Sequence, residues 1–172
     1  EAFSLLGGVG LFLFGMTIMS AGLKNACGDK LQTILEHATK NKLIAIVVGL
    51  GMTVLVQSSS ATDVMVIGFV NSGLMNLGQA IGVIMGANIG TTITALLASV
   101  GQSRNAKRTA LAHCVFNITG TFIFIWFVPW YAKFIQFISP KGPEIQIISR
   151  QIANAHTCFN IVCTLIWLPL LP

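Results

Sequence analysis

The segment V-Q-S-S-S-A-T-D at 56–63 concentrates polar side chains directly after the apolar run 43–55. It contains the amide of Gln57, three consecutive serines, the hydroxyl of Thr62 and the carboxylate of Asp63. Hydroxyl groups and the free N–H groups at the start of a helix donate to anions. Exposed carbonyl groups and hydroxyl lone pairs coordinate hard cations such as sodium. The segment therefore has the groups to bind a tetrahedral oxyanion with a cation close by.

Basic side chains are missing around this segment, since no lysine or arginine lies between Lys42 and Arg104. An anion would then be held by backbone dipoles and hydroxyl groups, with the cation offsetting its charge. A purely structural explanation also stays open, because serine and threonine in membrane helices allow close packing and bond across helices.

A second polar stretch, G-A-N-I-G-T-T, interrupts an apolar run at 86–92. Its glycines belong to a stripe with a period of four residues: Gly82, Gly86 and Gly90. Such a stripe lets the backbone of another helix approach closely. Asn88, Thr91 and Thr92 add side-chain oxygens beside the stripe, which packing alone does not require.

A short motif occurs twice, as A-H-C-V-F-N-I at 112–118 and as A-H-T-C-F-N-I at 155–161. In each copy a histidine and an asparagine are four residues apart and share a helix face: His113 with Asn117, and His156 with Asn160. No carboxylate is near either histidine in the sequence, so we expect no metal site and no acid placed to orient a histidine as the base for a nucleophilic serine. We expect hydrogen bonds between helices, with a pH-sensing role left open, and we expect no enzyme activity.

The composition identifies the environment of these motifs. Of 172 residues, 54% are hydrophobic and 9% are charged, whereas soluble domains carry about 25% charged residues. The chain is therefore expected to be an integral membrane protein. Its cysteines form no C-x-x-C pair and are expected to be small core residues: Cys27, Cys114, Cys158 and Cys163. The net charge of +5 comes from basic residues between the apolar runs, a pattern that does not fit nucleic-acid binding.

Four apolar runs are long enough to cross about 30 Å of hydrocarbon as helices: 2–23, 79–100, 109–130 and 151–171. Two further runs, 43–56 and 64–75, would reach only about 21 and 18 Å. One helix over 43–75 would be about 50 Å long, too long even when tilted. We therefore predict an all-α membrane protein with a re-entrant helical hairpin at 43–75 that turns at Q-S-S-S and lines a cavity.

The charged segments between the runs do not decide the topology. A re-entrant hairpin and a single broken crossing both divide the basic residues seven against three, and both place 24–42 in the cytoplasm. Within 24–42, apolar residues recur at helical spacing between lysines, as in a helix lying on the membrane surface. A simple polar linker remains the alternative, and 131–150 is expected to be a loop.

Four motifs, in this order, resemble the type II sodium-dependent phosphate cotransporters in their bacterial branch: G-L-F-L-F-G-M-T-I-M-S-A-G-L, V-Q-S-S-S-A-T, I-M-G-A-N-I-G-T-T-I-T and A-H-C-V-F-N. The resemblance covers nearly the whole chain. It implies an inverted-repeat transporter in a bacterial inner membrane, in which each repeat contributes a Q-S-S-S hairpin to a phosphate site. Residues 1–150 would form the first repeat, and 151–172 would open the second.

The resemblance also implies roles for individual residues. The candidates for phosphate are Gln57, Ser58, Ser59 and Ser60. The candidates for sodium are Thr62, Asn88, Thr91, Thr92 and, from its carboxylate, Asp63. The expected activity is sodium-coupled symport of inorganic phosphate, with no cofactor other than the coupling ions.

Two departures from the family qualify this expectation. The chain has one Q-S-S-S where the family has two, so half of the site would come from a missing repeat or from a second copy in the opposite orientation. Asp63 stands where the family more often has a small or hydroxyl residue; it could bind a cation, hold a proton or reach water. A passive ion channel and an inactive half-transporter remain the alternatives.

Overall fold

The computed structural model describes residues 3–11, 14–15, 17–18, 21–22, 33, 37, 39–71, 73–142 and 144–170, and among these it contains helices and no strand. Residues 3–11 are helical with exposed side chains. The rest of the predicted 2–23 span is described only in part, and most of the 24–42 segment, with Cys27, lies outside the described residues. The remaining elements are α2 (Lys42–Val56), α3 (Ser59–Asn71), α4 (Leu77–Ala98), α5 (Arg104–Phe124), η1 (Ile125–Phe127), α6 (Val128–Ile138), α7 (Glu144–Trp167) and η2 (Leu168–Leu170).

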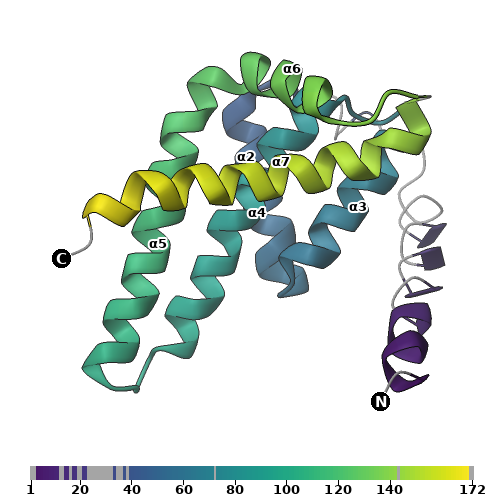
Figure 1. The fold of residues 1–172 in the computed structure, drawn as a ribbon. Coiled ribbons are helices and arrows are strands. Elements are labelled where there is room, and N and C mark those ends of the chain that lie inside the picture. Colours follow the sequence, from purple (N-terminus) through teal and green to yellow (C-terminus); the bar gives the residue numbers. More distant parts are fainter. Residues whose placement is uncertain are drawn as a thin grey trace.

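Helix α4 is the centre of the arrangement, because α2, α3, α5, α6 and α7 all contact it (Figure 1). Its start is fixed by a capping box: Oδ1 of Asn76 accepts from the Gln79 N–H at 3.0 Å, and the Asn76 N–H donates to Oε1 of Gln79 at 2.8 Å. Every residue from Leu77 to Asn88 is buried or half-buried. Since α4 has no charged residue and is mostly apolar, it fits an interior position in the bundle.

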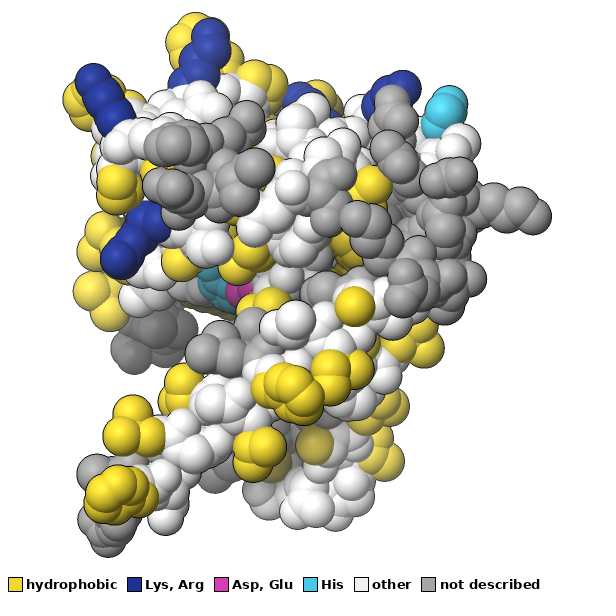
Figure 2. Space-filling view, turned by 90° about the vertical axis from the view of Figure 1, so that its right-hand side faces the viewer, with side chains coloured by type: hydrophobic (Ala, Val, Ile, Leu, Met, Phe, Trp, Pro, Cys, Tyr) yellow, Lys and Arg dark blue, Asp and Glu magenta, His cyan; other side chains and the backbone are white. Residues whose placement is uncertain are grey.

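Three helical stretches are long and apolar enough to cross a membrane among the described residues: Leu77–Ala98, Arg104–Ile138 and Ile147–Leu170. Large apolar side chains are also exposed on the outside, including Leu111 and Phe122 on α5 and Leu165 on α7. Figure 2 shows one face on which apolar side chains are spread widely, whereas lysine and arginine side chains gather at its upper end. The prediction of an all-α membrane protein is confirmed.

Helices α2 and α4 run parallel, because their contacts advance together: Gly82 meets Ala45, Gly86 meets Ile46 and Gly90 meets Thr53. Helix α3 returns from the end of α2 towards the start of α4 and is antiparallel to both. After the Gly90–Thr53 contact, α2 continues for about one turn and α4 for about two. The α2–α3 turn accordingly stops short of the α4–α5 connection (Figure 1).

The segment 131–150, expected to be a loop, is largely helical. Helix α6 continues to Ile138, because Val128, Tyr131 and Ile135 form an apolar stripe that is buried despite the charged Lys133. The described loop residues after α6 are 139–142, which include a proline and a glycine, and α7 begins at 144, seven residues before the predicted 151. In Figure 1, α7 runs across α4 and α5, burying a stripe that consists of Ile148, Ile152, Ala155, Phe159 and Cys163.

Candidate functional site

The turn between α2 and α3 consists of Gln57 and Ser58 alone. Gln57 is the one described non-glycine residue with positive φ, at 58°, and its N–H donates to the Thr53 carbonyl at 2.7 Å. Its side-chain amide donates to the Val54 carbonyl, which ends α2. A residue in the left-handed backbone conformation ends many helices, and here it reverses the chain direction within two residues. The sequence prediction put the turn at Q-S-S-S, and the structure places the last two serines in the first turn of α3.

Ser58 starts α3 as its N-cap residue. Its Oγ accepts from the Ala61 N–H at 3.2 Å, and its carbonyl accepts from the Thr62 N–H at 3.1 Å. The N–H groups and hydroxyls of Ser59 and Ser60 form no hydrogen bond within the described part of the chain. Ser60 and Gln57 are exposed, and Ser58 and Ser59 are half-buried. Four hydrogen-bond donors at a helix N-terminus are therefore available to an anion.

A hydroxyl pair, Thr53 and Thr62, joins the two helices below this turn. The two Oγ1 atoms are 3.0 Å apart, and Thr62 also donates to the Ser58 carbonyl at 3.1 Å. Both side chains are buried. Sequence reasoning selected Thr62 but missed Thr53. The available signal was its spacing, because Thr53 continues the small-residue series of Ala45 and Gly49 at intervals of four.

The glycine stripe of α4 determines how deeply α2 packs. A methyl group on Gly86 would overlap the Ile46 carbonyl, and one on Gly49 would overlap the Val83 carbonyl. At Gly90 it would lie 2.8 Å from Cβ of Thr53. The predicted close approach of another backbone is thus observed, and the partner is α2 itself. This contact sets the position of the α2–α3 turn relative to α4.

Asp63 contacts a residue that the sequence did not link to it. Its Oδ2 accepts a hydrogen bond from Nδ1 of His156, at a distance of 2.6 Å, which ties α3 to α7. The other carboxylate oxygen, Oδ1, is buried and has no hydrogen-bond partner among the described residues. The expectation that no acid stands near His156 is wrong, because α7 crosses α3 and brings together residues that are 93 positions apart. In Figure 2, an acidic and a histidine side chain meet in a recess of this face.

The candidate sodium ligands divide into two groups. Thr62 and Asp63 belong to α3, whereas Asn88, Thr91 and Thr92 belong to α4. Asn88 is two residues from both Gly86 and Gly90, so it points away from the face that meets α2. Thr91 and Thr92 donate to carbonyls of their own helix, at 3.1 and 2.7 Å. Asn88 is buried, and its Nδ2 has no partner within the described ranges.

The repeated motif has the same local structure on both helices. Asn117 donates to the His113 carbonyl and Asn160 to the His156 carbonyl, each at 3.0 Å. The surroundings differ, since His113 is exposed on α5 whereas His156 is half-buried against α3. Among the described residues, no three side chains of His, Cys, Asp or Glu come together as they would at a metal site.

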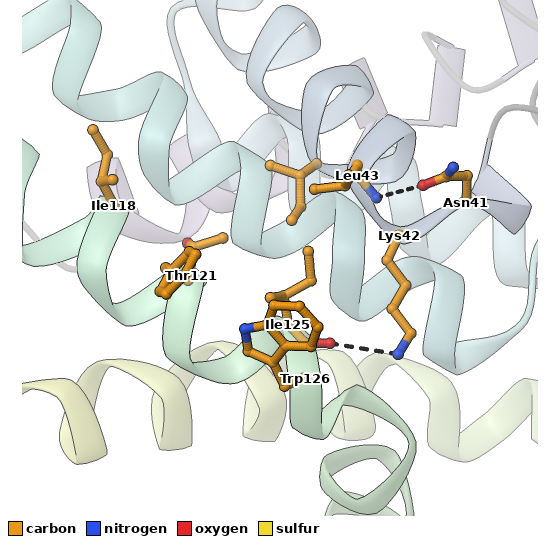
Figure 3. Close-up of a pocket in the computed structure, with 9 residues that line it drawn as sticks. Asn41, Lys42, Leu43, Ile118, Thr121, Ile125 and Trp126 are labelled. Atoms are coloured by element: carbon orange, nitrogen blue, oxygen red, sulfur yellow. Dashed lines mark hydrogen bonds between the residues drawn. The ribbon is translucent and has the colours of Figure 1, made fainter.

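A large apolar groove lies elsewhere, between the start of α2 and the α5–η1 junction (Figure 3). It has a volume of about 580 Å³ and is lined mainly by apolar side chains, including Ile118 and Trp126. Lys42 donates to the Ile125 carbonyl at its edge, at 3.5 Å. The groove is at the opposite end of α2 from Gln57, so it is separate from the polar turn.

Residues 11–138, which contain α2 to α6 and the polar turn, match the model of the family described as Na+/Pi-cotransporter. The chain belongs to this family. The Na+/Pi-cotransporter match contains every candidate phosphate and sodium residue but ends before α7, so His156 lies outside it. No solved structure matches the chain with significance.

Individual relatives of this chain come from bacteria and mammals. Protein YqeW of Bacillus subtilis is 33% identical over 168 residues, which are 95% of this chain and 52% of that protein. YjbB of Escherichia coli K12, named for inorganic phosphate export, is 37% identical over 53% of this chain and 17% of its own. The rat sodium-dependent phosphate transport protein 2A is 34% identical over 66% of this chain and 19% of its own. The chain thus spans about half the length of the first relative and less than a fifth of the others.

Proposed function

We propose that this chain takes part in sodium-coupled transport of inorganic phosphate across a cell membrane, with phosphate bound at the α2–α3 turn. The observation that carries the proposal is the N-terminus of α3, where the N–H groups and hydroxyls of Ser59 and Ser60 have no partner among the described residues, in a chain of the Na+/Pi-cotransporter family. Gln57 and Ser58 complete the candidate set. The localisation that goes with this function is a bacterial inner membrane.

The depth of the turn supports this role. Helices α2 and α3 are about 22 and 20 Å long, too short to cross about 30 Å of hydrocarbon. We infer that they form a re-entrant hairpin, since polar backbone at membrane depth is tolerated where it lines a wet cavity. Phosphate would enter that cavity and replace water on the serine donors.

The cation part of the proposed site lies one helical turn further along α3. Asp63 follows Ser59 by four residues, which puts the two on one face of α3, about 6 Å apart along the axis. In the proposed sequence of events, sodium binds first near Thr62 and Asp63, with Asn88, Thr91 and Thr92 as further candidates on α4. Phosphate then binds the serines, and the loaded site opens to the other side of the membrane.

One polar turn forms half of a transport site in the proposed inverted-repeat architecture. A second Q-S-S-S hairpin would face the first, supplied by another repeat or by a second copy of this chain. Relatives are named for both sodium-dependent transport and export, so flux has to be measured in both directions.

The test compares Ser59→Ala/Ser60→Ala with the unmodified chain. We expect loss of radiolabelled phosphate binding while the thermal unfolding temperature in detergent stays the same. Thr109→Ala/Thr164→Ala is the matched control, because both hydroxyls donate to carbonyls of their own helix, far from the turn in sequence. Unchanged phosphate affinity in the serine variant would rule out the turn as the binding site.

Transport itself is measured in liposomes, with an inward sodium gradient and then with potassium in its place. Sodium-dependent flux by this chain alone would show that two copies complete the site. Equal flux in both salts would indicate a channel. Binding without flux would indicate a half-site that needs its second repeat.

A further inference from the structure

The contact between Asp63 and His156 is not needed for the phosphate donors of the turn, yet both side chains are largely withdrawn from solvent. The side-chain exposure is 18% for Asp63 and 25% for His156. Nδ1 of His156 lies 2.6 Å from Oδ2 of Asp63, whereas Oδ1 is buried without a partner in the described part of the chain. Oδ2 of Asp63 is therefore fixed by a hydrogen bond, whereas Oδ1 can still accept a hydrogen bond or coordinate a cation.

A buried carboxylate oxygen without a partner is costly, and this cost defines what would bind there. The partner must be a hydrogen-bond donor or a cation. The adjacent hydroxyl of Thr62 is already engaged with Thr53 and with the Ser58 carbonyl, so it does not supply that donor. A carboxylate oxygen that lacks a donor is a ligand for a small hard cation.

We propose that His156 is a positioning residue for the coupling cation: by binding Oδ2 of Asp63, it directs Oδ1 towards a sodium ion beside the start of α3. This inference rests on the proposed function and deepens it, because it names the side chain that orients the cation ligand. Outer-sphere partners of this kind fix the rotamer of the ligand that they touch. His156 itself does not contact the ion.

The location of His156 gives this role a structural consequence. Since His156 belongs to α7 and Asp63 to α3, the cation would be bound by a carboxylate whose orientation depends on the packing of α7. A variant that moves the donor atom should then weaken sodium binding without touching the serines that hold phosphate.

The test compares two amide substitutions of His156 that place the donor nitrogen at different distances from Cα. The amide nitrogen of asparagine is as many bonds from Cα as Nδ1 of histidine, so His156→Asn can keep the donor to Asp63. The amide nitrogen of glutamine corresponds to Nε2, so His156→Gln moves the donor away. His113→Gln is the matched control, because this histidine has the same A-H-x-x-F-N motif but is exposed.

The first readout is stabilisation of the purified chain by sodium in the absence of phosphate, measured as the unfolding temperature in sodium chloride against choline chloride. We expect the sodium concentration for half-maximal stabilisation to rise about tenfold or more in His156→Gln, the scale typical of outer-sphere ligands. His156→Asn and His113→Gln should stay within about twofold of the unmodified chain. The second readout is phosphate affinity at saturating sodium, which should be the same in all four proteins.

The two readouts test the positioning role and the proposed function separately. A chain that sodium does not stabilise, an unchanged response in His156→Gln, or equal defects in His156→Asn and His156→Gln would each overturn the positioning role. Sodium stabilisation that follows the expected pattern in a chain that binds no phosphate would leave the positioning role intact and refute the proposed function. If the chain binds phosphate but His156→Gln leaves the sodium response unchanged, the positioning role is refuted and the proposed function stands.

Discussion

Gly49→Ala would place a methyl group where α2 and α4 touch. The added Cβ would overlap the Val83 carbonyl, far inside the 3.0 Å that Cβ atoms essentially never undercut. Gly51, two residues further along α2, has nothing within 4 Å of the same added atom. Gly49→Ala and Gly51→Ala therefore add the same methyl group to α2, the first inside the contact with α4 and the second outside it.

The geometry sets the size of the effect. To restore ordinary van der Waals distances, α2 and α4 must separate by about 1 Å or more. Overpacking of this kind costs about 1–3 kcal/mol. The separation would also stretch the 3.0 Å contact between Thr53 and Thr62, whose loss adds about 1 kcal/mol. We expect Gly49→Ala to lower the free energy of unfolding by about 2–4 kcal/mol, whereas Gly51→Ala should raise it by up to about 1 kcal/mol through helix propensity.

Both variants can be compared by thermal unfolding in detergent, together with phosphate binding. Gly49→Ala should lose affinity for phosphate as well as stability, because the contact positions the turn. If it is as stable as Gly51→Ala and binds phosphate equally well, the parallel packing of α2 on α4 is wrong, and with it the placement of Ser59 and Ser60.

Three further substitutions test other parts of the fold, each by unfolding temperature in detergent. Thr53→Val keeps the shape of the side chain but removes the hydroxyl that pairs with α3, and should cost about 1 kcal/mol; an unchanged temperature would mean that this pair does not stabilise the hairpin. Tyr131→Phe removes a buried hydroxyl that donates to the Ala155 carbonyl at 2.6 Å, so a loss of about 1 kcal/mol is expected, and its absence would contradict the docking of α6 on α7. Gly120→Ala would press against Sγ of Cys163 and should cost about 1–3 kcal/mol, with recovery in the Cys163→Ala background; equal costs in both backgrounds would show that α5 and α7 do not meet there.

The sequence by itself determined the features that depend on local composition. Apolar runs of sufficient length predict membrane spans, because hydrocarbon thickness sets the number of helical residues needed. The spacing of Gly82, Gly86 and Gly90 predicts a close helix contact, since residues four apart share a face. The polar interruption after residue 55 predicts the chain reversal, and the structure narrows it to Gln57 and Ser58.

Only the tertiary structure decided which polar groups meet. Asp63 and His156 are 93 positions apart, and the angle at which α7 crosses α3 brings them together. The register of α2 against α3 brings the hydroxyl of Thr53 to that of Thr62. Asn88 lies on the face of α4 opposite the glycines that contact α2, so its side chain points away from α2. Periodicity specifies the face of a helix on which a residue lies, but not which other helix covers that face. That choice depends on packing over the whole bundle, which no local stretch of sequence contains.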